Sequence, residues 1–238
     1  MFLQISLAVV TIVTYALFFN PSIALGLFGL LAIHEYGHVV GLKITNISYE
    51  GPYFIPFLGA IIVPQEQHNS MWDEFVFVYL GPLFGLFSVG LSIGLYYITH
   101  NMIFMAIGFL AAFINLMNLI PVFPLDGGRL TRSIFTSISN SKASYFILAG
   151  IGGIFISLCV FFHFWVFSIF GVLGLFQIRN EYYNAFYAQI TGNAMQKMSV
   201  QKIITTTLLY GALVLILLYC VIYTGQIVGL ENINKFFE

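Results

Sequence analysis

The chemistry of this sequence is concentrated in residues 34–38, which read His-Glu-Tyr-Gly-His inside an otherwise apolar stretch. On an α-helix, residues four apart share one face, so the imidazoles of His34 and His38 can reach the same metal ion. Glu35 is rotated by about 100° from His34 and can hold a water molecule beside that metal. Zinc lowers the pKa of a bound water to about 7, and an adjacent carboxylate can accept its proton. The motif therefore predicts one catalytic zinc ion per chain.

The apolar setting of this motif narrows its interpretation. A carboxylate within a membrane span costs about 2.5–3.5 kcal/mol on insertion scales. Burying polar groups without partners adds to that cost. The alternative, a pair of hydrogen-bonded core histidines beside an interfacial glutamate, explains less of the pattern than a metal site does.

A zinc site of this kind needs a third protein ligand and an open position for water. The remaining histidines are poor candidates, because His68 lies in a polar loop and because we expect His100 and His163 on the opposite side of the membrane. Each of them is better explained by an interfacial role.

Asp126 is a better candidate for the third ligand. It stands in the segment 118–129 (NLIPVFPLDGGR), where two prolines end the preceding helix and two glycines permit a tight turn. Asp126 could therefore project back into the helix bundle, on the same side as the histidine pair. The alternative is a carboxylate that caps a turn beside Arg129.

The composition indicates an integral membrane protein. Of the 238 residues, 60% are hydrophobic and 7% charged, and the mean hydropathy is +0.96, whereas soluble domains carry about 25% charged residues. A net charge of −1 gives no reason to expect nucleic acid as a partner. Cys159 and Cys220 lie inside apolar runs and do not suggest a disulfide.

About 20 apolar residues are needed to cross roughly 30 Å of hydrocarbon. This length predicts an all-α polytopic membrane protein with about seven transmembrane helices. The predicted spans are 3–19, 22–42, 74–99, 102–121, 144–162, 164–178 and 203–224. The N-terminus lacks the basic region of a signal peptide, so the first span is expected to be retained. We expect a single membrane domain over 1–238.

The stretch 144–178 could cross the membrane once or twice. Two crossings place all but one of the basic residues on one side, and one crossing divides them five to three. The seven are Lys43, Arg129, Arg132, Lys142, Arg179, Lys197 and Lys202, and the eighth is Lys235. The positive-inside rule favours two crossings, with the N-terminus outside and the metal site nearer the cytoplasmic side.

Residues 44–72 do not resemble a span. Three prolines forbid a continuous helix between 44 and 64, while Ile61-Ile62-Val63 favours extended chain. Irregular backbone at membrane depth is tolerated only where protein buries it or where it lines a cavity. We predict a short re-entrant β-hairpin near 46–63. The alternative is an interfacial loop without a function.

Two spaced motifs resemble the site-2 protease family of intramembrane zinc metallopeptidases. One is the HExxH sequence of 34–38, and the other is Asn118-x-x-Pro121 followed by Asp126-Gly127. The sequence GPLFG at 81–85 is similar to that family's Gly-Pro motif. The resemblance covers a core of about 22–178, and the span at 203–224 is an addition to it.

The resemblance implies a role for each motif residue. His34, His38 and Asp126 would be zinc ligands, Glu35 the general base, and Asn118 a group beside the site that steadies the oxyanion. The hairpin near 46–63 would receive substrate. One departure is Gly85, where many members have an asparagine, which puts any substrate-positioning role there in doubt.

The predicted function is that of a zinc-dependent intramembrane endopeptidase in the cell membrane. Its partners would be the lipid bilayer and membrane-anchored proteins or signal-peptide remnants, whose transmembrane segments it cleaves in regulated intramembrane proteolysis. Two alternatives are a catalytically silent scaffold of the same fold and a metal transporter. The sequence indicates no oligomeric state.

Overall fold

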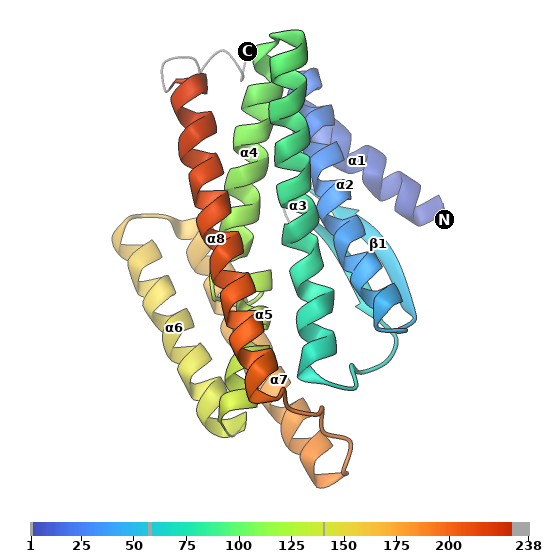
Figure 1. The fold of residues 1–238 in the computed structure, drawn as a ribbon, viewed down its shortest axis with the longest axis vertical. Helices are drawn as coiled ribbons and strands as arrows, with labels where there is room; N and C mark the ends of the chain where they lie inside the picture. The colour runs from blue at the N-terminus through green and yellow to red at the C-terminus, as the bar shows by residue number, and fades with distance from the viewer. Residues whose placement is uncertain (1, 57–58, 140, 230–238) are drawn as a thin grey trace. The chain divides into compact units, whose positions relative to one another are not determined.

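The computed structural model describes residues 2–56, 59–139 and 141–229, and these residues form eight helices and one β-hairpin (Figure 1). The elements in chain order are α1 Phe2–Phe18, α2 Pro21–Ile44, β1 Tyr49–Ile55, β2 Gly59–Pro64, α3 Met71–Thr99, α4 Met102–Asn118, α5 Asp126–Ile138, α6 Ser141–Phe161, α7 Trp165–Ile190 and α8 Val200–Val228. A helix lies at each of the seven predicted spans, and α5 is a helix that the sequence did not predict.

Four helices are long and apolar enough to cross a membrane. They are α2, α3, α8 and the part of α6 from Lys142 to Phe161. The apolar helices α1 and α4 have 17 residues each, which is about 26 Å and short of the hydrocarbon thickness. The predicted multi-pass membrane architecture is confirmed in this coarser form, while the count of seven spans stays a prediction.

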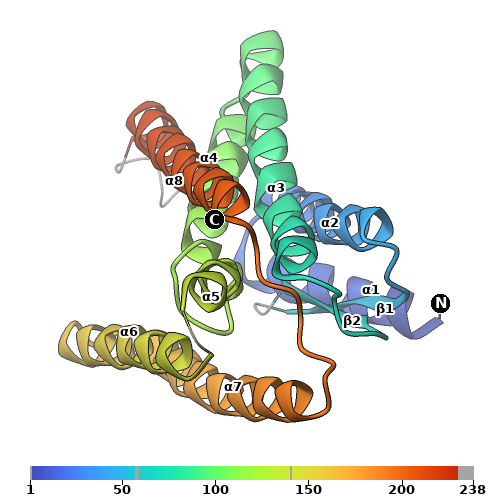
Figure 2. The same cartoon turned by 60° about the horizontal axis from the view of Figure 1, so that its bottom comes forward.

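The ambiguous stretch 144–178 is broken into two helices. Residues 162–164 separate α6 from α7, and His163 adopts a left-handed φ of 61° at the break. The two helices pack side by side (Figure 2). α7 continues to Ile190, twelve residues beyond the predicted end of its span. The prediction stopped too early because the second half of this helix is polar and therefore does not extend the apolar run. A helix pair of this kind is what two crossings would require.

The predicted β-hairpin near 46–63 is present. β1 and β2 pair antiparallel, with Tyr53 opposite Ile61 and Phe54 opposite Ala60. β1 packs against α1, where the side chain of Gln4 donates a hydrogen bond to the carbonyl of Gly51 at 2.9 Å. β2 packs against α2 (Figure 1). The predicted hairpin also includes residues 57 and 58, which lie outside the described residues.

Contacts divide the chain into two compact units. The first unit comprises Met1–Gln67, Leu80–Leu116 and Leu213–Glu238, and the second comprises His68–Tyr79 and Met117–Ala212. In the first unit, Tyr15, Ile23, Ala24 and Leu27 form an apolar core between α1 and α2. In the second unit, Phe123, Tyr145, Leu148 and Ile178 form a core beside α6 and α7. The single domain over 1–238 stays a prediction, and Lys235 lies outside the described residues.

The two glycines after Asp126 do not form the tight turn that the sequence predicted. They lie in the first turn of α5, where a Cβ on Gly127 would overlap the carbonyl of Leu119. A Cβ on Gly128 would come within 2.6 Å of the backbone nitrogen of Phe123. The glycines are therefore needed because α5 approaches the preceding backbone closely.

A buried ionic cluster joins three helices of the second unit. Arg132 on α5 forms ion pairs with Glu74 on α3 and Glu181 on α7, and Arg129 Nε lies 3.6 Å from the Glu74 carboxylate. Glu74 and Arg132 are almost completely buried. Burial alone would lower the pKa of Arg132, but the two carboxylates outweigh it and raise that pKa. Arg132 was used above as one of the basic residues that predict the membrane topology. In the structure its charge is buried and paired with two carboxylates.

Candidate metal centre

The candidate residues His34, Glu35 and His38 lie on α2. The helix begins at Pro21, and the side chain of Asn20 accepts a hydrogen bond from the Ser22 N–H at 2.9 Å, which caps its first turn. From there α2 runs unbroken through the HExxH sequence to Ile44, with its basic residue, Lys43, in the last turn. His34, Glu35 and His38 are all buried in this helix.

The two imidazoles lie on one face of α2, as their spacing of four residues requires. The Nε2 atoms of His34 and His38 are 3.1 Å apart, and the ring centroids are 4.9 Å apart in an edge-to-face arrangement. Two nitrogens bound to one tetrahedral zinc at about 2.0–2.1 Å would be separated by about 3.3 Å. The histidine pair therefore already has nearly the spacing that a shared zinc ion demands.

Glycines bring α2 and α3 into close contact at this level. A Cβ on Gly37 would overlap the carbonyl of Leu80, and a Cβ on Gly81 would overlap the imidazole ring of His38. The ring of His38 thus lies directly against the backbone of α3. This contact gives the first glycine of the GPLFG sequence a physical role, since any side chain at 81 would displace a candidate ligand.

Glu35 reaches the hairpin. Its Oε1 accepts a hydrogen bond from the backbone N–H of Ala60 at 3.1 Å, and Gly59 lies next to the same oxygen. A candidate general base is therefore connected to β2, the strand that packs against α2.

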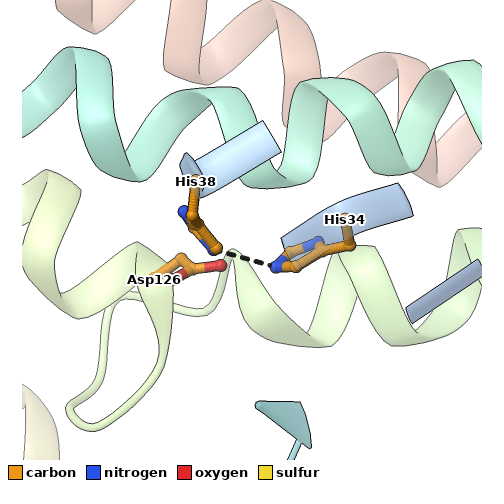
Figure 3. Close-up of side chains that lie close together, drawn as sticks. All are labelled: His34, His38 and Asp126. Carbon is orange, nitrogen blue, oxygen red and sulfur yellow. Dashed lines mark hydrogen bonds between the residues drawn. The ribbon is translucent and has the colours of Figure 1, made fainter. Parts of the chain in front are cut away.

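Asp126 is the first residue of α5 and is half-buried. In Figure 3 the dashed line joins the imidazoles of His34 and His38, both on α2. Two imidazoles and one carboxylate form a donor set that fits zinc. His34 and His38 belong to the first unit and Asp126 to the second, so the closing of this site by Asp126 is part of the proposal below.

The remaining predicted and rejected residues lie as follows. Asn118 is the last residue of α4 and is half-buried, and its role beside the oxyanion stays a prediction. His68 is buried against Phe77, with ring centroids 5.2 Å apart. His100 and His163 are exposed at helix ends with left-handed φ angles. Among the described residues, none of these three histidines belongs to a group of side chains that could hold a metal ion.

Asn115 is a site residue that the sequence reasoning missed. It lies on α4 and its Oδ1 is 2.7 Å from Nδ1 of His34. The one signal in the sequence was the position of Asn115 one helical turn before Asn118. This signal is weak, because sequence spacing does not show which residues of α4 face α2.

Sequence comparison shows which known proteins this chain resembles. Residues 94–162, which include Asn118 and Asp126, match the family model described as Peptidase family M50. Stage IV sporulation protein FB of Bacillus subtilis is 27% identical over 109 residues, which are 45% of this chain and 38% of that protein. A Synechocystis protein named as a zinc metalloprotease, sll0528, is 29% identical over 132 residues, which are 53% of this chain and 34% of that protein.

The matched regions thus span little more than a third of the length of either relative. They show what this chain is similar to, and they do not carry either relative's whole activity to it. The match to Peptidase family M50 and the two relatives confirm the resemblance predicted from the two motifs, which is to the site-2 protease family of zinc metallopeptidases.

Proposed function

We propose that the chain is a zinc-dependent intramembrane endopeptidase whose metal ion is bound by His34, His38 and Asp126. The observation that carries this proposal is the 3.1 Å separation of the two Nε2 atoms on a buried face of an apolar helix. Two imidazoles and one carboxylate leave a fourth position open, which is the composition of a catalytic zinc site. The proposal takes one ion per chain.

Glu35 is the general base in this proposal. A bound zinc ion would supply Lewis-acid activation of the scissile carbonyl and of water. The Glu35 carboxylate accepts the proton of the attacking water and later returns it to the leaving amine. The Ala60 N–H orients the Glu35 carboxylate through Oε1. Asn118 is proposed to steady the oxyanion.

The hairpin offers an edge for an unwound substrate. Ala60 is paired with Phe54, yet its N–H donates to Glu35 and therefore points away from β1. Backbone groups alternate in direction along a strand, so those of Ile62 point the same way. A substrate segment that adds to this edge of β2 keeps its backbone hydrogen-bonded and passes close to Glu35.

The substrates that fit this arrangement are transmembrane segments of membrane-anchored proteins or signal-peptide remnants. We propose seven spans in the cell membrane, with the site nearer the cytoplasmic side. Cysteines placed at Lys142 and Lys197 should then both be labelled from the cytoplasm in intact cells, with a cysteine before Phe2 labelled from outside. Labelling of 142 and 197 from opposite sides would contradict two crossings in 144–178.

The decisive experiment reconstitutes the purified chain into proteoliposomes with a panel of single-span fusion proteins. Cleavage should be lost on treatment with a zinc chelator and restored by added zinc, and the purified chain should hold about one zinc ion. Zinc binding without cleavage of any fusion would favour the catalytically silent scaffold. Chelator-sensitive uptake of zinc into the vesicle lumen would favour a transporter and contradict the protease.

A further inference from the structure

Asn115 is the buried partner of one of the two histidines. The residue is 3% exposed, and its Oδ1 lies 2.7 Å from Nδ1 of His34. Its Nδ2 donates a hydrogen bond to the carbonyl of Ala111, one turn earlier in α4, at 2.8 Å. All three residues belong to the first unit.

These two contacts determine which nitrogen of His34 carries the proton. The amide nitrogen of Asn115 must face the Ala111 carbonyl, because only that end of the amide can donate. The amide oxygen then faces His34, and since it can only accept, Nδ1 of His34 must be the protonated nitrogen. Nε2 is left with its lone pair, and this is the atom 3.1 Å from Nε2 of His38.

Gly85 makes room for the amide. A Cβ on Gly85 would overlap both the oxygen and the carbon of the Asn115 amide. An asparagine at 85, which the family resemblance would lead one to expect, cannot coexist with Asn115 in its observed position. The volume beside α3 is therefore used by an amide that comes from α4.

We propose that Asn115 is a positioning residue that presents Nε2 of His34 to the metal, and that Gly85 is required because it accommodates the Asn115 amide. This inference rests on the proposed role of His34 as a zinc ligand. Outer partners of this kind fix the tautomer and ring orientation of a metal-bound histidine, and their loss typically costs 10–100-fold in metal affinity.

The test measures the zinc affinity of the chain of residues 1–238 in detergent by competition with a chromophoric chelator. Asn115→Leu preserves the shape of the side chain but removes the acceptor, so zinc affinity should fall by about 10–100-fold. The absorption bands of the cobalt-substituted protein should shift, because the ligand field at the ion changes. Asn115→Asp keeps an acceptor and should retain most of the affinity.

Gly85→Ala should reproduce the Asn115→Leu defect, since the new Cβ displaces the amide. The double variant Gly85→Ala with Asn115→Ala should be no worse than Asn115→Ala alone, because both changes act through one hydrogen bond. Ser88→Ala is the matched control. It removes a buried hydrogen bond to the Gly85 carbonyl without touching His34, and should leave zinc affinity unchanged.

Unchanged zinc affinity and an unchanged cobalt spectrum in Asn115→Leu would overturn the inference, as would full additivity in the double variant. Should Asn115→Leu fail to fold, Asn115→Ala and Gly85→Ala give the same comparison. A wild-type chain that binds no zinc would instead refute the proposed function, so the two failures are distinguishable.

Discussion

In the first unit, His34, His38 and Glu35 bring ligand nitrogens and a carboxylate to one buried segment of α2, whereas in the second unit Glu74 and Glu181 are matched by Arg132. Both regions take polar side chains out of water. The second cluster contains its own cation. The first brings together types of atom that can bind a cation.

This difference explains why the cluster on α2 indicates a reactive site, whereas the cluster around Arg132 indicates a stabilising role. A buried carboxylate opposite a guanidinium is compensated within the protein, so it needs no ligand. Two imidazole Nε2 atoms 3.1 Å apart have nearly the spacing of two nitrogens bound to one zinc ion. Whether a buried cluster contains its own opposite charge therefore distinguishes a structural cluster from a candidate metal site better than the degree of burial does.

The largest effect that would test this comparison is expected from Glu35→Gln. The amide is close to the carboxylate in size but cannot accept a proton from water, so cleavage should fall by about 10²–10⁴-fold. Zinc content should stay near one per chain, and the variant should capture uncleaved substrate in a pull-down. Glu50→Gln, an exposed change on β1, is the control. Near-normal cleavage would refute the general-base role, and loss of zinc would make Glu35 a ligand.

Arg132→Leu should be the most damaging change in the second unit. It leaves Glu74 buried without its closest ion-pair partner, and breaking a buried pair in this way typically costs 3–5 kcal/mol of stability. Denaturant unfolding in detergent would measure the loss, and zinc per folded chain should be unchanged. Arg179→Leu removes an exposed cation and should shift stability by less than about 0.5 kcal/mol. Equal effects of the two changes would contradict a structural role for the cluster.

Asp126→Ala should lower zinc affinity by more than about tenfold, because even outer-shell partners of a metal are worth 10–100-fold. Asp73→Ala is a close match, since Asp73 is also an acidic residue in the first turn of a helix, α3. Only Asp126→Ala should release zinc, as measured by competition with a chelator. A similar loss in both variants would point to helix stability, and no loss in either would remove Asp126 from the site.

The smallest effect is expected from His68, which lies in the loop before α3. Burial lowers the pKa of His68 from its ordinary value of 6.5, partly opposed by the nearby Glu74 carboxylate. The unfolded chain then binds more protons than the folded chain, so stability should fall as the pH drops below about 6.5, by at most about 1.4 kcal/mol per pH unit. His68→Phe keeps a ring against Phe77 and should flatten this dependence between pH 7 and 5. An unchanged slope in thermal unfolding would show that another group is responsible.

Much of the architecture follows from local sequence signals. Long apolar runs predicted a helix at each of seven places, and three prolines with a β-branched run predicted the hairpin. The spacing within HExxH was enough to place His34 and His38 on one face of a helix, because that face is fixed by local geometry.

Features that depend on contacts between distant segments could not be predicted. The partner of His34 is 81 residues away, in a helix whose rotation the sequence does not determine. Arg132 was counted only as one of the basic residues that set the topology, because its two carboxylate partners lie 58 and 49 residues away in the sequence. α5 was missed because its polar, glycine-containing start is typical of a turn, although those glycines serve close backbone packing.

The contact between α2 and α3 also predicts how the chain tolerates variation. At Gly37 and Gly81, a single methyl group would overlap a backbone carbonyl or the buried imidazole ring of His38. In a saturation mutagenesis screen, these two positions should accept no replacement, including alanine. Exposed apolar positions on the same helices, such as Leu25 and Phe87, should accept most other apolar residues. The glycines would then stand out as sharply as the candidate metal ligands, although they carry no chemistry of their own.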